Sequence, residues 1–131
     1  MLAGREVPVT IEEVFDSARQ VAAAEAMKSL PARGGKRFAE VFRHGSMQIE
    51  IYAPRGRDTQ RPHTRDEVYV VVRGSGVYVN GVQRFAFGPG DVLFAAAGER
   101  HHFESFSADF FTWVLFYGPE GGEKGTPESR P

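Results

Sequence analysis

Two histidines and one glutamate are the residues of this sequence best suited to chemistry. His63 and Glu67 lie four residues apart at the entrance to an apolar run, and His101 lies near the start of another run. Residues of the same parity in a strand face the same side, so the even spacing lets His63 and Glu67 point inward together. Two imidazoles and a carboxylate suit one divalent transition metal ion (Fe, Mn, Ni, Cu or Zn), with coordination positions left open for substrate or water.

Strands are the elements predicted to position these residues. From residue 36 onward, short apolar runs alternate with glycine and proline, which is typical of a β-sandwich or barrel. Asn80-Gly81 predicts a tight hairpin with a type I′ turn, whose two central residues need positive φ. The predicted strands cover residues 36–43, 47–53, 67–72, 77–79, 85–87, 91–95, 101–105 and 110–117.

The two ends of the chain differ from this β-rich middle. Thr10 and Glu13 have the spacing of a capping box, and they start an apolar stripe at helical spacing. The stripe consists of Ile11, Val14, Phe15, Ala18, Val21 and Ala22. The last residues are rich in Gly, Pro, Glu and Lys, which predicts a disordered tail. The expected organisation is a helical segment over 1–35, a β-domain over 36–117 and a tail over 118–131.

Composition narrows the classes of function. The chain has 131 residues, enough for one core, and a formal charge of -1 from 16 Lys plus Arg and 17 Asp plus Glu. This balance gives no electrostatic footprint for nucleic acid or an anionic membrane. There is no cysteine, which excludes disulfides and thiolate sites. The chain shows neither a signal peptide nor a membrane-spanning run, so we expect a cytoplasmic protein.

Two motifs in the sequence resemble those of the cupin superfamily. His63, Glu67 and Gly74 match the second half of the first cupin motif, and Gly90, Gly98 and His101 match the second. The resemblance implies a small single-domain protein with a double-sheet jelly-roll barrel, here preceded by a helix. It also implies that His63, Glu67 and His101 hold the metal ion, and that the protein is a homodimer.

Arg61 departs from the cupin pattern, because it stands where the family has its first histidine. A guanidinium stays protonated and cannot bind a metal. In one interpretation Arg61 faces the cavity and pairs with Glu67 in place of the metal. In another, Arg61 lies at the barrel mouth and binds an anionic group of the substrate. Burying Glu67 without a cation is strongly unfavourable, so some positive centre is expected beside it.

Several further residues are candidates for secondary roles. Gln60 and His102 are candidates for an additional ligand or a substrate contact, although His102 should point away from His101 on a regular strand. His44 is expected to be an exposed turn residue, and Asp58 and Asp66 are interpreted as loop residues. Some aromatic residues must line the cavity of a small barrel, and the candidates are Tyr52, Tyr69, Phe94, Phe103 and Trp113.

Two functional hypotheses follow from these residues. The first is a metal-binding cupin with a small-molecule pocket inside the barrel, such as a metal-dependent oxygenase or isomerase. The alternative is a non-catalytic barrel that binds or senses a small ligand, metal-free and with Arg61 paired to Glu67. The fold supports many unrelated activities, so the choice depends on the geometry of the site.

Overall fold

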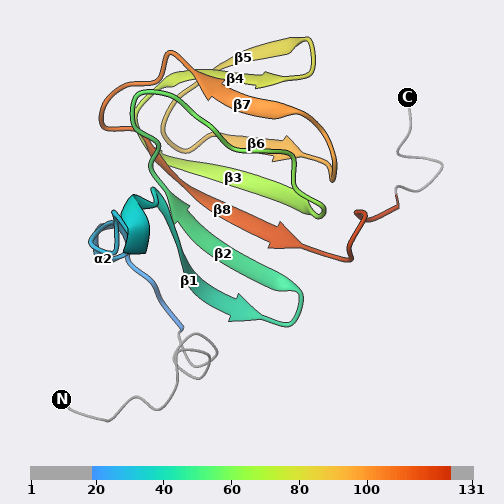
Figure 1. Cartoon of the computed structure of the whole chain (residues 1–131), viewed down its shortest axis with the longest axis horizontal. Helices are drawn as coiled ribbons and strands as arrows, with labels where there is room; N and C mark the ends of the chain where they lie inside the picture. Colours follow the sequence, from blue (N-terminus) through green and yellow to red (C-terminus); the bar gives the residue numbers. More distant parts are fainter. Residues whose placement is uncertain (1–18, 125–131) are drawn as a thin grey trace.

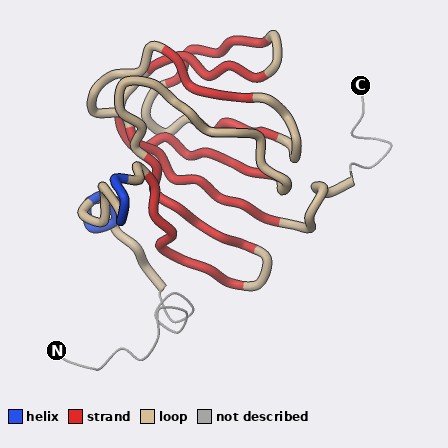
Figure 2. Tube along the Cα trace, in the orientation of Figure 1, coloured by secondary structure: helices blue, strands red, loops and turns tan. Residues whose placement is uncertain are grey.

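Two antiparallel β-sheets facing each other form the body of the protein (Figures 1 and 2). The computed structural model describes residues 19–124. The larger sheet has five strands in the order β1-β2-β8-β3-β6, and the smaller has three in the order β5-β4-β7. This mainly β, two-sheet architecture confirms the predicted fold class.

All the predicted strands are present, with ends that lie within two residues of the expected positions. The glycine and proline residues between the apolar runs therefore marked the turns correctly. The strands are β1 (Phe38–His44), β2 (Met47–Tyr52), β3 (Asp66–Arg73), β4 (Gly76–Asn80), β5 (Gln83–Phe87), β6 (Val92–Ala95), β7 (His101–Glu104) and β8 (Phe111–Tyr117).

Within the described residues, a short α-helix, α2 (Ala23–Met27), lies beside the larger sheet, and a 3-10 turn follows at Arg33–Gly35. Most of the predicted amphipathic helix, from Thr10 to Ala18, lies outside the described residues. Its last member, Ala22, is the extended N-cap of α2. Buried Ala26 packs with Ile51 and Phe111, so α2 covers part of the outer face of the sheet. No helix within residues 19–124 is long and apolar enough to cross a membrane.

The β4-β5 hairpin is present, but its turn lies one residue further along than predicted. Asn80 pairs with Gln83, so Gly81 and Val82 form the two-residue loop. Of these two, only Gly81 has a positive φ, at 61°, which matches a type II′ rather than a type I′ turn. Asn80 instead uses its side-chain amide to donate to Glu99 Oε1 at 3.0 Å and to the Phe94 carbonyl at 3.3 Å.

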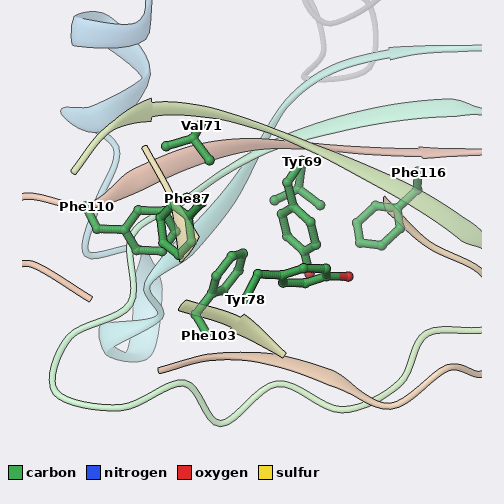
Figure 3. Packing of buried hydrophobic residues seen from close by; sticks show 8 residues of the cluster. Tyr69, Val71, Tyr78, Phe87, Phe103, Phe110 and Phe116 are labelled. Carbon is green, nitrogen blue, oxygen red and sulfur yellow. The ribbon is translucent and has the colours of Figure 1, made fainter. Parts of the chain in front are cut away.

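The interior between the two sheets has an apolar end and a polar end. At the apolar end the rings of Phe87 and Phe110 lie 4.9 Å apart, and Phe103 packs against both. Figure 3 shows Phe116 at the opposite end of this cluster, away from Phe110. Phe116 contacts the imidazole of His63, with ring centroids 4.7 Å apart. The polar residues of the barrel therefore gather at the Phe116 end of an otherwise aromatic core.

The outer face of the larger sheet is also apolar, and α2 covers only part of it. A groove of about 780 Å³ remains on this face, lined among others by Val21, Phe42, Ile49, Val70, Trp113 and Leu115. The structure contains a single chain, so the predicted homodimer stays a prediction, as does the cytoplasmic location.

The chain after β8 makes hydrogen bonds to the barrel, and the predicted disorder of the tail over 118–131 stays a prediction. Gly121 N–H donates to the Thr64 carbonyl at 2.7 Å, and Glu123 N–H donates to Asp66 Oδ2 at 2.8 Å. Asp66, interpreted from the sequence as a loop residue, is instead the buried first residue of β3 and also accepts from Ala97 N–H. Asp66 Oδ2 thus holds the segment after β8, while Oδ1 holds the loop between β6 and β7. Residues 125–131 lie outside the described part of the chain.

Gly74 lies in the turn between β3 and β4, and replacing it tests how closely this turn approaches the residues just before β8. Gly74 has a φ of 92°, and a Cβ there would collide with Phe110 Cα and lie 2.7 Å from Ser107 Oγ. We expect Gly74→Ala to lower the free energy of unfolding by roughly 3 kcal/mol. Gly81→Ala is the control, since a Cβ at Gly81 meets no atom within 4 Å. Its expected loss is ~1 kcal/mol. Equal losses in urea unfolding would contradict the close approach.

Candidate functional site

The register of the larger sheet brings the polar residues together. Along β3, the odd-numbered residues Glu67 and Tyr69 face the interior, and they pair across β8 with Phe116 and Val114. On the other side of β8, Val114 pairs with Glu50 of β2. The smaller sheet faces this surface and contributes His101, the first residue of β7. The site is thus built from three strands of one sheet and one strand of the other.

Glu67 and His101 form a buried ion pair at the centre of the site. Both side chains are 1% exposed, and His101 Nε2 lies 2.9 Å from Glu67 Oε1. His101 Nδ1 lies 2.8 Å from the Glu99 carbonyl, an acceptor, so this nitrogen must donate. Opposite a carboxylate, Nε2 must donate as well, which makes His101 an imidazolium. Burial alone lowers the pKa of His101, but the hydrogen bonds to Glu67 and the Glu99 carbonyl raise it overall.

A chain of hydrogen bonds with fixed directions supports this imidazolium. The Tyr69 hydroxyl lies 3.0 Å from His101 Nε2 and donates to Gln60 Oε1 at 2.9 Å, so it accepts from His101. The Gln60 amide donates in turn to Asp58 Oδ2 at 2.6 Å. Asp58 also accepts from the Tyr52 hydroxyl and, at 2.8 Å, from Phe103 N–H. Every donor in the chain therefore has an acceptor, and the chain ends on the Asp58 carboxylate.

His63 stands at the solvent side of the same carboxylate. Its Nε2 lies 4.0 Å from Glu67 Oε1, and its side chain is 40% exposed. Sequence reasoning predicted that His63, Glu67 and His101 point inward together, and the structure brings them together around Glu67 Oε1. The second oxygen, Glu67 Oε2, is buried and has no hydrogen-bond partner within the described residues. An unpaired buried carboxylate oxygen is costly, so a further donor or cation that reached this atom would be bound favourably.

A cavity of about 420 Å³ lies next to Glu67 and His63. Its walls include the rings of Phe38, Tyr52 and Phe116, the side chain of Val114, and the polar groups of Gln60 and Glu50. Burial, reinforced by the negative charges of Glu40 and Glu67, raises the pKa of Glu50 to about 7. The cavity thus has two carboxyl groups among largely apolar and aromatic walls.

The three predicted ligands match a divalent metal ion in type, and the unpaired Glu67 Oε2 offers a free donor. Their arrangement is less suitable, because both nitrogens of His101 are already engaged in hydrogen bonds and His63 stands 4.0 Å from the carboxylate. Across residues 19–124, no three side chains of His, Cys, Asp or Glu are arranged to hold a metal ion. In this arrangement the positive centre beside Glu67 is the proton of His101.

Arg61 is not that positive centre. It is an exposed residue of the cavity wall, and the ion pairs of Glu67 in the described chain are with His63 and His101. The pairing of Arg61 with Glu67, left open by the sequence, is therefore not seen. Gln60 does line the cavity, whereas His102 points away from it and pairs with Glu104 at 2.7 Å, as the alternation along a strand predicts.

The candidate wall aromatics separate into three groups. Tyr52 lines the cavity, while Tyr69 and Phe103 are buried in the core beside it. Phe94 and Trp113 lie outside the cavity, Trp113 in the groove on the outer face and Phe94 half exposed on β6. Tyr69 and Val114 face the interior, so their neighbours along the strands face outward. Trp113 is next to Val114, and Phe94 pairs with Val68, which is next to Tyr69, so both point to the outer face. His44 is exposed at the end of β1, as expected.

Two acidic residues of the site were missed by sequence reasoning. Asp58 lies in a loop, as interpreted, but its role as the anchor of the hydrogen-bond chain to Tyr69 was not predicted. Glu50 was not considered, although its position in the alternating run Met47 to Tyr52 was a usable signal. Gln48, Glu50 and Tyr52 share one face of this strand, and a carboxylate on the same face as Tyr52 could have been placed toward the interior.

Replacing Asp58 tests whether its carboxylate anchors the site. Asp58→Asn would turn an amide donor toward Gln60, Tyr52 or Phe103 N–H, all of which already donate. We expect the free energy of unfolding to fall by ~2–3 kcal/mol. Asp109→Asn is the control, since Asp109 is exposed and accepts one hydrogen bond from Ser107. It should change stability by less than about 0.5 kcal/mol in urea unfolding. Similar losses for both variants would contradict an anchoring role.

The raised pKa of Glu50 predicts a pH-dependent effect on stability. The folded protein holds the Glu50 proton more tightly than the unfolded chain, so this group lowers stability as pH rises from 4.5 to about 7. We expect Glu50→Gln to be more stable than wild type by roughly 1–3 kcal/mol at pH 8, and similar to wild type at pH 4. Urea unfolding at the two pH values measures this. A variant less stable than wild type at pH 8 would contradict it. The control is Glu104→Gln, which removes an exposed carboxylate paired with Arg84 and should give no gain.

Comparison with known proteins agrees with the two-sheet architecture. An uncharacterized protein of Streptomyces coelicolor is 33% identical over 85 residues, which are 63% of this chain and 81% of that protein. The TT1209 structure from Thermus thermophilus is 27% identical with a TM-score of 0.54, over 70% of this chain and 92% of that one. A cupin 2 conserved barrel domain protein from Salinispora arenicola has a TM-score of 0.53 at 17% identity, over 62% and 74% of the two chains.

A match to a family model assigns the chain to a protein family. The model of the cupin domain matches residues 48–117, from the second residue of β2 to the last residue of β8. This stretch is more than half of the sequence, and it holds Glu50, Asp58, His63, Glu67 and His101. The chain is a member of the cupin family.

Proposed function

We propose that this cupin binds a small molecule in the cavity beside Glu67, and that it does so without a resident metal ion. The observation that carries the proposal is that Glu67, whose buried Oε2 has no hydrogen-bond partner within the described residues, lines a cavity of about 420 Å³. Small-molecule sites are typically apolar cavities of this size with a few polar groups that fix the orientation of the ligand. Glu67, Gln60 and His63 are the polar groups that would orient it here.

The ion pair with His101 supports the metal-free form. A buried carboxylate needs a positive partner, and His101 provides one at 2.9 Å. Its Nε2 proton faces Glu67 and the Tyr69 hydroxyl, and its Nδ1 proton is held by the Glu99 carbonyl. The hydrogen-bond chain to Asp58 keeps the ring in place, so Glu67 is fixed in position before a ligand arrives. A pre-organised carboxylate binds more tightly because less freedom is lost on binding.

A divalent metal ion at His63, Glu67 and His101 is the second candidate, and the same unpaired oxygen of Glu67 favours it. Such an ion would supply Lewis-acid chemistry to an oxygenase or isomerase. His101 would then have to release the proton on Nε2 and give up its hydrogen bonds to Glu67 and Tyr69. A metal-bound form would therefore be favoured at higher pH, since ligand imidazoles must be deprotonated.

Elemental analysis distinguishes the two candidates. The protein is purified without metal-affinity steps and compared with His63→Ala and His101→Ala. The metal-free proposal predicts metal well below one equivalent per chain in all three proteins. Near-stoichiometric metal in the wild type, abolished by both substitutions and lost as pH falls below about 6.5, would establish the second candidate instead.

Ligand binding is tested on protein treated with EDTA. A library of small polar molecules is screened by thermal shift, and hits are measured again with Thr59→Trp. Thr59 is an exposed residue of the cavity wall, so the added ring should fill the cavity and abolish binding. Gln83→Trp on the smaller sheet is the control and should leave binding unchanged. Hits that survive Thr59→Trp would place the binding elsewhere.

A further inference from the structure

We propose that the ligand of this cavity carries a single positive charge, such as a primary ammonium group, which lies against Glu50 and Glu67 while its apolar part contacts Phe38 and Phe116. The inference rests on the proposed function and names its ligand class. It depends on the charges, the open carboxylate oxygen and the aromatic walls of the cavity.

The charges of the site do not balance without a ligand. Glu50 and Glu67 contribute two carboxylates to the cavity, and the imidazolium of His101 compensates only Glu67. Within the described residues, the Glu50 side chain accepts a hydrogen bond from the neutral Gln48 amide at 3.3 Å. Arg61 also lines the cavity, but it is exposed and forms no ion pair with either glutamate. When Glu50 is ionised, above its pKa of about 7, one negative charge therefore remains for a ligand of charge +1 to neutralise.

Glu67 offers an atom for such a ligand. Its side chain is 1% exposed, and Oε2 has no partner although Oε1 is bonded to His101. An ammonium group has three donors, enough for Glu67 Oε2, Glu50 and one further acceptor. A neutral hydroxyl has a single donor and leaves the buried charge uncompensated. The site should therefore discriminate strongly between an amine and an alcohol of the same shape.

The walls of the cavity also suit an organic cation. Phe38, Tyr52 and Phe116 present aromatic rings to the cavity, together with the apolar side chain of Val114. Aromatic faces attract cations, and the attraction grows when the site is shielded from water. The raised pKa of Glu50 agrees with this assignment, because burial and then the negative charges of Glu40 and Glu67 disfavour its ionised form, which a cation would stabilise.

Three ring compounds of nearly equal size test the inference: benzylamine, benzyl alcohol and benzoate. Binding to EDTA-treated protein is measured at pH 8 by calorimetry and by ligand-observed NMR. We expect benzylamine to bind at least about tenfold more tightly than benzyl alcohol, and benzoate not to bind. Glu50→Gln should reduce the affinity for benzylamine by about tenfold, with little effect on the alcohol. Glu104→Gln removes one negative charge outside the cavity and should leave both affinities unchanged.

The outcomes separate this inference from the proposed function. If benzyl alcohol or benzoate binds as tightly as benzylamine, and Thr59→Trp abolishes that binding, the cavity is a ligand site but the preference for a cation is wrong. If Glu50→Gln folds normally and keeps full affinity for benzylamine, the assignment of Glu50 is wrong. If none of the three compounds binds at millimolar concentration, the inference fails, and the proposed function then depends on the library screen alone.

Discussion

The burial of Glu67 is the constraint on which the rest of the site depends. A carboxylate between two β-sheets loses its water, and this loss must be offset by a positive partner and hydrogen bonds. His101 reaches Glu67 from the opposite sheet, so the ion pair links the two sheets at the polar end of the barrel. The Tyr69, Gln60 and Asp58 side chains then extend this link to the loop before β3. One buried charge therefore accounts for the position of most polar residues in the interior.

The aromatic end of the barrel makes this polar end possible. Phe87, Phe103 and Phe110 fill the space between the sheets at one end with ring-to-ring contacts of about 5 Å. Their burial stabilises the fold, since the hydrophobic effect grows with the apolar area removed from water. Phe103 also belongs to the site, because its backbone N–H donates to Asp58. The packed core thus holds β7 in the position that aims His101 at Glu67.

The sequence predicted the strands and the central residues because both depend on local patterns. Glycine and proline mark the turns, and parity along β3 correctly placed Glu67 facing inward.

The strand register and the path of the loops depend on residues that are far apart in the sequence. Trp113 and Phe94 could be assigned to the outer face only once the pairing of β8, β3 and β6 was known. Asp58 gains its role from Phe103, 45 residues away, and no spacing rule connects the two. The turn at Gly81 moved by one residue because Asn80 makes contacts with β6 and Glu99 that the hairpin sequence does not contain.

The negative charges of the site can be neutralised in two ways: by a proton on His101 together with a cationic ligand, or by a divalent metal ion. With a proton on His101 and with Glu50 ionised, the two carboxylates and the imidazolium sum to one negative charge, which a ligand of charge +1 would neutralise. With a divalent ion, His101 is neutral, and the ion alone neutralises Glu50 and Glu67. The same cavity can therefore be balanced by a proton and an organic cation, or by a metal, but the two states compete for His101 Nε2. The hydrogen bonds of Nε2 to Glu67 and Tyr69 favour the proton, and the hydrogen-bond chain from Tyr69 to Asp58 strengthens that preference because each of its donors already has an acceptor.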